Sequence, residues 1–259
     1  MKFLLSLLSL FWSLSISAAP KSELWDFWNQ SNEANTQEVS HQAWQQLLDR
    51  YLSQQGMHTL FDYANVEISD REKLQTYINQ LARLDPRTLN KQQQYAYWIN
   101  LYNALTVNII LEHYPVSSIT KIGGWFRFGP WNLPLLEIAS QKLTLNDIEH
   151  RILRPIWQDP RIHYVVNCAS LGCPNLQSEA FTAQNIDRLL EKSTHEFINS
   201  EKGAKITKDQ LILSSIYQWY ADDFGSQAEL MAHLSLYRPE LTTYRGTIRY
   251  EYDWRLNSK

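Results

Sequence analysis

The sequence has few glycines, two cysteines, no cluster of basic residues and no apolar run as long as a membrane span. Eight glycines in 259 residues argue against a repeat-built or loop-rich all-β protein. The longest apolar stretches, residues 3–16 and 101–111, are shorter than the roughly 20 residues of a spanning helix. With 24 basic against 27 acidic residues, nothing favours binding to nucleic acid or to an anionic membrane surface.

Several catalytic sequence motifs are also absent. The chain contains no GxSxG, HExxH or GxGxxG motif and no Walker phosphate-binding loop. A conventional serine hydrolase and a phosphate-binding enzyme therefore lack support, and the sequence predicts neither a metal ion nor an organic cofactor.

The first eighteen residues have the order of a secretory signal peptide. Lys2 precedes the apolar stretch, and the small residues Ser17, Ala18 and Ala19 follow it. We expect cleavage between Ala18 and Ala19, because cleavage after Ala19 would place Pro20 directly after the scissile bond. A retained N-terminal anchor is the alternative. The mature protein is therefore expected to be periplasmic or secreted, with no membrane span after signal cleavage.

The rest of the chain divides into a polar N-terminal arm, residues 19–38, and one globular domain, residues 39–259. Ten Trp, fourteen Tyr and nine Phe supply large side chains for a core. Apolar spacing predicts helices near 40–52, 69–85, 91–113, 144–155, 182–197, 215–224 and 226–237, strands at 162–168 and 248–255, and a hairpin at 205–213. The predicted fold is a single helix-rich α+β domain with a small, mostly antiparallel sheet.

Two asparagines interrupt the apolar helix predicted at 91–113. Asn100 and Asn103 are three residues apart and therefore share a face of the helix. A buried amide without partners costs about 1–3 kcal/mol, so other polar groups must satisfy both side chains. They either bridge neighbouring backbone or belong to a site.

Glu149 and His150 lie in the helix predicted at 144–155, where Thr144 and Asp147 form a capping box. Adjacent helical residues point about 100° apart, so the two cannot both face one substrate atom directly. His150 is either a structural histidine or a catalytic base.

Both cysteines fall in the segment IHYVVNCASLGCP, together with His163. Three interpretations are open: a Cys168–Cys173 disulfide, a metal site that includes His163, or a reactive thiol at Cys168. An extended chain would place His163 roughly 16 Å from Cys168. A base for that thiol is then best supplied by His150.

Five motifs resemble the domain of unknown function 547 family in sequence and in order. They are WINLYNAL (98–105), LTLNDIEHRILR (143–154), IHYVVNCASLGCPNL (162–176), IYQWYADDF (216–224) and YDWRLN (252–257). The resemblance implies that a site uses the shared positions Asn100, Asn103, Glu149, His163 and Cys168. Relatives that carry Ser where this chain has Cys173 would favour a working thiol over an obligatory disulfide.

A buried helix followed by a strand with a histidine is also similar to papain- or transglutaminase-like enzymes. In those enzymes the thiol lies on the helix, which here would be near Asn100 or Asn103. The similarity therefore implies a fold and not a transferable mechanism.

Two functions follow. The first is a thiol-dependent hydrolase or acyl transferase with Cys168 as nucleophile, His150 or His163 as base, and Asn100 or Asn103 as an oxyanion or orienting donor. The alternative is a non-catalytic envelope binding or scaffold domain in which Cys168 and Cys173 form a disulfide. Its partner, a small molecule, a peptide or an envelope component, would bind the aromatic loop around Trp125, Phe126 and Trp131, because exposed aromatics favour sugars and peptides.

Overall fold

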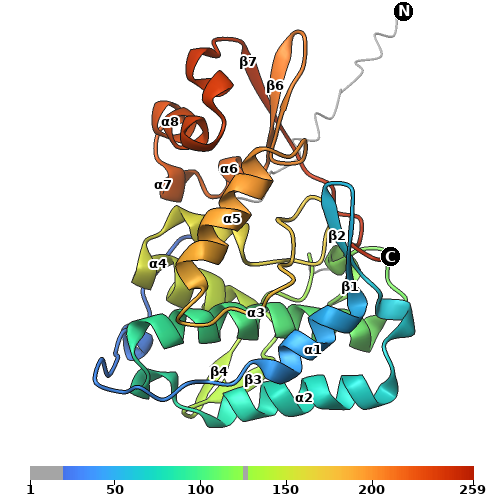
Figure 1. The fold of residues 1–259 in the computed structure, drawn as a ribbon, viewed down its shortest axis with the longest axis vertical. Helices are drawn as coiled ribbons and strands as arrows, with labels where there is room; N and C mark the ends of the chain where they lie inside the picture. Colours follow the sequence, from blue (N-terminus) through green and yellow to red (C-terminus); the bar gives the residue numbers. More distant parts are fainter. Residues whose placement is uncertain (1–19, 125–127) are drawn as a thin grey trace, which may run out of the picture.

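The computed structural model describes residues 20–124 and 128–259 (Figure 1). The predicted signal peptide and Trp125 lie outside these ranges. The longer helices are α1 (Gln42–Tyr51), α2 (Ile68–Arg83), α3 (Lys91–His113), α5 (Ile186–Ile198) and α8 (Gln227–Tyr237), and the short ones are α4 (Arg154–Trp157), α6 (Ile216–Trp219) and α7 (Ala221–Phe224). A π-helical segment, η5 (Asp147–Leu153), runs directly into α4. Within the described ranges, no helix has the length and hydropathy needed to cross a membrane.

The strands form three small sheets and confirm the α+β prediction. β1 (Leu52–Gln55) pairs with β2 (His58–Phe61), and β3 (Leu136–Ile138) pairs with β4 (Gln141–Leu143), both antiparallel. In the third sheet β6 (Gln210–Ser214) lies between an antiparallel β5 (Ala204–Ile206) and a parallel β7 (Thr247–Glu251). The hairpin predicted at 205–213 is the β5–β6 pair.

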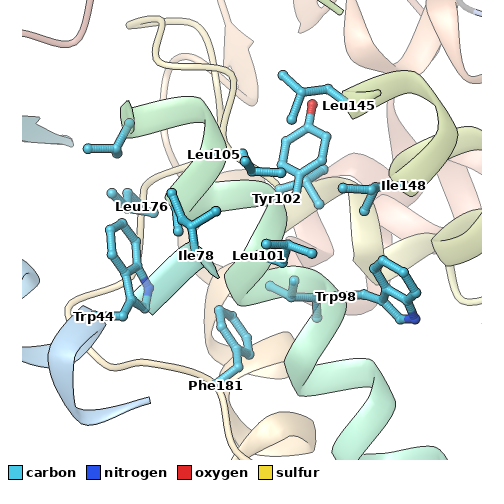
Figure 2. Close-up of a cluster of buried hydrophobic side chains, with 14 of the residues drawn as sticks. Trp44, Ile78, Trp98, Leu101, Tyr102, Leu105, Leu145, Ile148, Leu176 and Phe181 are labelled. Atoms are coloured by element: carbon cyan, nitrogen blue, oxygen red, sulfur yellow. The ribbon is translucent and has the colours of Figure 1, made fainter. Parts of the chain in front are cut away.

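Helix α3 lies at the centre of the larger hydrophobic core and spans the predicted residues. Asn90 caps it by accepting a hydrogen bond from the Gln93 N–H (2.9 Å). Apolar side chains leave α3 in several directions, so it is covered by α1 and α2 on one side and by the segments of Leu145 and Phe181 on others (Figure 2). Removing a side chain as large as Trp98 from this core would cost about 3–5 kcal/mol.

A second, smaller core holds β5–β7 and α6–α8 together in the upper half of the view (Figure 1). The segment 162–169 contributes to both cores: Tyr164 packs in the smaller one, whereas Ile162, Val165 and Ala169 pack in the larger one. This segment therefore crosses the boundary between the two cores.

The strand predicted at 162–168 is wrong. Residues Pro160–Tyr164 form a 3₁₀ helix, η6, whose first turn is capped by Asp159 through the Arg161 N–H (2.9 Å), and an irregular segment follows. The segment is buried because it lies between the two cores, and residues 162–167 are all buried. Burial of an irregular segment on both sides gives an apolar run that resembles a strand in the sequence.

The capping boxes have different outcomes. Thr144 and Asp147 bond reciprocally: each backbone N–H donates to the other residue's side-chain oxygen at 3.0 Å. The spacing of Ser69 and Glu72 also predicts a capping box, and this prediction is wrong: the N-cap of α2 is Glu67, and it makes no side-chain cap hydrogen bond.

Pro155 does not end its helix, because the N-terminal arm supplies the hydrogen bonds that the proline cannot. Proline has no N–H, so the carbonyls of His150 and Arg151 lose their π- and α-helical partners. The backbone N–H groups of Glu23 and Trp25 donate to these two carbonyls, each at 3.0 Å. Further along the arm, Trp28 is buried edge-on against Trp98 of α3, with ring centroids 5.2 Å apart.

Candidate active site

Asn100 and Asn103 both bond to backbone of distant segments. Asn100 Nδ2 donates to the Phe181 carbonyl (2.7 Å), and its Oδ1 accepts from the Phe181 N–H (3.0 Å). Asn103 Nδ2 donates to the Val165 carbonyl (2.9 Å), and its Oδ1 accepts from the Asn167 N–H (2.8 Å). Each buried amide thus fixes one segment against α3, with one donor and one acceptor engaged.

Asn103 also shapes the loop that carries Cys168. Asn167, which it holds, accepts from the Ala169 N–H (2.8 Å) and donates to the Pro174 carbonyl (2.7 Å). Ala169 has φ 57°, a left-handed conformation that is rare for a non-glycine residue and needs surrounding contacts to hold it. The result is a fixed loop in which Cys168 is partly exposed while its two neighbours are buried.

The Cys168 sulfur is surrounded by three side-chain groups that can donate a hydrogen bond to it. It is 2.8 Å from Cys173 Sγ, 3.2 Å from Ser170 Oγ and 3.0 Å from the Tyr252 hydroxyl. Ser170 and Tyr252 are themselves 2.9 Å apart. Both cysteines are free thiols. Among the described residues, no hydrogen bond joins this sulfur to a histidine ring.

These contacts shift the pKa values of the two thiols in opposite directions. Burial raises the pKa of Cys168, but hydrogen bonds from Cys173, Ser170 and Tyr252 outweigh it, so the pKa lies below its ordinary value. Burial and the neighbouring Cys168 raise the pKa of Cys173 well above its ordinary value. Cys168 is therefore the thiol that ionises first.

A second polar group of side chains comes from η5, α4, η6 and α7. His163 Nε2 lies 2.6 Å from Asp223 Oδ2, and Arg154 Nη2 donates to Asp223 Oδ1 at 3.0 Å. Burial opposes ionisation of Asp223, but its hydrogen bonds and charge attraction to His163 and Arg154 hold its pKa well below the usual range. Tyr102 of α3 donates to Glu149 Oε2 (2.8 Å), so a buried carboxylate lies beside this group.

The two histidines differ in which ring nitrogen is used. The Asp223 carboxylate can only accept, so His163 carries a proton on Nε2, and in the neutral form of the ring Nδ1 has the lone pair. That Nδ1 is buried and has no partner in the described part of the chain. At His150, by contrast, Nδ1 accepts from the Arg154 guanidinium (3.0 Å). Burial lowers the pKa of His150 to about 4, so the ring is neutral at pH 7.

The sulfur and the histidine group form one electrostatic region. The charge of Glu149 acts to raise the pKa of the Cys168 thiol. Burial opposes ionisation of Glu149, but attraction to His150 and His163 in their protonated forms and hydrogen bonds from Tyr102 and Tyr220 leave its pKa lowered.

Several residues of this region were not predicted as site residues: Ser170, Tyr220, Asp223 and Tyr252. The motifs at 216–224 and 252–257 contain three of them and were the available signal. Trp131 is half-buried and packs on Phe128 and Trp254.

Two other features lie apart from the chemistry just described. No group of three or more His, Cys, Asp or Glu side chains in the described ranges is arranged to hold a metal ion. An open cavity of about 610 Å³ lies between α8 and the residues after it, lined by Met231, Leu241, Tyr244 and Arg245 among others.

A family model described as "Protein of unknown function, DUF547" matches residues 86–198. This segment of the chain is therefore similar to the DUF547 family. The DUF547 match includes α3, η5 and the loop of Cys168, whereas Asp223 and Tyr252 follow it in the sequence. No curated protein and no solved structure matches the chain. The family brings no activity, and the similarity to papain- or transglutaminase-like enzymes stays a prediction.

Proposed function

We propose that this protein is a thiol-dependent hydrolase or acyl transferase with Cys168 as its nucleophile. The observation that carries the proposal is the set of three hydrogen-bond donors around the sulfur of Cys168, a partly exposed residue. They lower the pKa of the thiol although burial opposes ionisation. A thiolate is the reactive form of cysteine, and such an environment raises its population at neutral pH.

The chemistry is acyl transfer through a thioester. The thiolate attacks the carbonyl carbon of an ester or amide, and the carbon–oxygen or carbon–nitrogen bond breaks as the leaving alcohol or amine takes up a proton. Water or another acceptor then attacks the thioester, which returns the thiol and releases the acyl group.

His163 is the better candidate for the base. Its Nδ1 lone pair is free of protein partners, and Asp223 orients the ring through Nε2, which is the arrangement of a base held by a carboxylate. His150 has its Nδ1 engaged by Arg154 and is less suited. Asn100 and Asn103 have their amides engaged with backbone, so we assign them to positioning.

The test is a pre-steady-state burst with p-nitrophenyl acetate. We expect the reduced protein to release one equivalent of nitrophenolate as the acyl-enzyme forms, and Cys168→Ser to abolish the burst. His163→Gln should slow acylation by about 100-fold, the usual contribution of a general base. Cys173→Ser is the matched control, because it removes the other thiol and leaves the nucleophile. A burst that survives in Cys168→Ser would refute the proposal.

A non-catalytic binding or envelope-scaffold domain is the second candidate. It is favoured by the half-exposed rings of Trp131 and Trp254 near the sulfur. In that case partner capture persists in Cys168→Ser, and the native protein gives no burst.

We also propose that the protein is periplasmic or secreted, on the basis of the leader in residues 1–18. N-terminal sequencing of the protein from its native host tests this: a start at Ala19 supports export, and an intact Met1 contradicts it.

A further inference from the structure

Five aromatic side chains form a continuous surface cluster, which we name the aromatic cluster: Phe128, Trp131, Trp219, Tyr252 and Trp254. Neighbouring ring centroids are 4.6–5.9 Å apart, from Phe128 through Trp131 and Trp254 to Trp219 and Tyr252. Phe128 is 64% exposed, and the other four are half-buried. Large rings that remain accessible in a connected group commonly mark a binding site.

The cluster lies where the two hydrophobic cores meet. Trp131 and Trp254 pack against the larger core, whereas Trp219 and Tyr252 pack against the smaller one. Its rings are thereby supported from beneath by both cores, which gives a preorganised surface. Preorganised rings bind a ligand at a low cost in conformational entropy.

One end of the aromatic cluster touches the candidate nucleophile. The hydroxyl of Tyr252 lies 3.0 Å from Cys168 Sγ. Trp219 is followed in the chain by Tyr220, whose ring stacks on His163 with centroids 4.1 Å apart. A ligand on the rings is thus in line with the thiol and adjacent to the proposed base.

The polar groups beside the rings are neutral as a set. Asn146 Nδ2 donates to Asn132 Oδ1 (2.7 Å), and the Asn146 N–H donates to the carbonyl of Trp131 (3.0 Å). Next to Trp254, Arg255 Nε lies 3.0 Å from both carboxylate oxygens of Asp253, so these two charges compensate each other. These residues, which lie in the described part of the chain, therefore offer hydrogen bonding without a net charge.

This combination fits a saccharide better than other ligand classes. The faces of a sugar ring carry C–H groups that pack on the electron-rich faces of aromatic rings, and its hydroxyls need polar partners at the edge. A fatty acyl chain has no hydroxyl groups for the amides, and a charged ligand would need an unpaired opposite charge beside the rings.

We infer that the aromatic cluster binds a neutral oligosaccharide and presents an acyl group carried by one of its sugars to Cys168. The acyl part of this inference rests on the proposed thiol chemistry, and the saccharide part does not. The substrate class is then an acylated glycan, whose ester or amide carbonyl is attacked while the sugar chain stays on the rings.

The test is a binding titration of the reduced full chain with chitotetraose, a neutral saccharide that carries amide-linked acyl groups, followed by calorimetry. We expect Trp254→Ala to weaken binding by about tenfold, which is what the loss of one stacking ring costs. Phe128→Ala removes the most exposed ring and should act in the same direction even if Trp254→Ala folds poorly. Leu236→Ala on α8, which is 79% exposed, is the control and should leave affinity unchanged.

Cys168→Ala separates this inference from the proposed function, because it should keep full saccharide affinity. Saccharide binding without a nitrophenyl ester burst would refute the thiol chemistry alone. The saccharide inference is overturned if chitotetraose fails to bind while decanoate or trialanine does, if none of the three binds, or if both ring variants bind chitotetraose as tightly as the native protein.

Discussion

Two buried polar regions, both in contact with α3, are built on opposite principles. Asn100 and Asn103 form hydrogen bonds through their side-chain amides with the backbone of distant segments. The region of Cys168, Glu149 and His163 bonds side chain to side chain, and it leaves the His163 Nδ1 without a partner.

The difference indicates how to distinguish architecture from chemistry among buried polar residues. A side chain whose amide oxygen and nitrogen both bond to backbone of a distant segment holds the chain in place. A group of ionisable side chains with shifted pKa values and a free lone pair is suited to proton transfer. The three predictions below test this distinction, beginning with the largest effect.

Asn103→Ala should destabilise the protein by about 4 kcal/mol, because it leaves the buried Val165 carbonyl and Asn167 N–H without partners, each at about 1–3 kcal/mol. Chemical denaturation measures the change. Asn108→Ala on the same helix, which removes only an exposed bond to Glu112, is the control and should cost under about 0.5 kcal/mol. Equal effects of the two variants would contradict a positioning role for Asn103.

His150 should make stability fall as the pH drops from 6.5 to 4. Its ordinary pKa of 6.5 is lowered by burial to about 4, so between these values the unfolded chain binds a proton that the folded protein does not. Above pH 6.5 both states are neutral, and below pH 4 both are charged. The full loss is about 3 kcal/mol.

His150→Gln should remove that part of the pH dependence in denaturation curves, although His41, also lowered by burial to about 4, contributes in the same direction. His195→Gln, on the exposed face of α5, is the control and should leave the slope unaltered. An unchanged slope in His150→Gln would mean that the pKa of His150 is the same in the folded and the unfolded protein.

Tyr252→Phe should have the smallest effect on stability, about 1 kcal/mol, and a distinct effect on chemistry. Losing the hydroxyl removes one of the donors that lower the pKa of Cys168, so the thiolate fraction at pH 7 falls. Alkylation kinetics measure this decrease. Tyr250→Phe on β7 is the control: it leaves the contact between Tyr252 and Cys168 in place, so Cys168 should be alkylated as fast as in the native protein.

Sequence patterns are sufficient to predict those elements of the fold whose structure is determined by residues close together in the chain. The bounds of α3, the Thr144–Asp147 capping box and the β5–β6 hairpin follow from apolar spacing and turn residues, and the structure has all three. These features depend on neighbours within one or two turns of the chain.

The site depends on contacts that the sequence does not encode locally. Asp223 lies sixty positions after His163, and Tyr252 lies eighty-four after Cys168, so only tertiary packing could pair them. The 3₁₀ helix at 160–164 is not predicted, because a segment buried between two cores has an apolar pattern that resembles that of a strand. Cys168 and His163 were nonetheless identified as candidates from their residue types and their motif.

The most direct test of the central claim is the pH dependence of alkylation at each cysteine of the reduced, folded protein, followed by mass spectrometry of the labelled peptides. Cys168 should react first, with an apparent pKa below the roughly 8.5 of a free cysteine, while Cys173 stays unreactive until the protein unfolds. A Cys168 thiol that does not react, or that ionises no more readily than Cys173, would contradict the account.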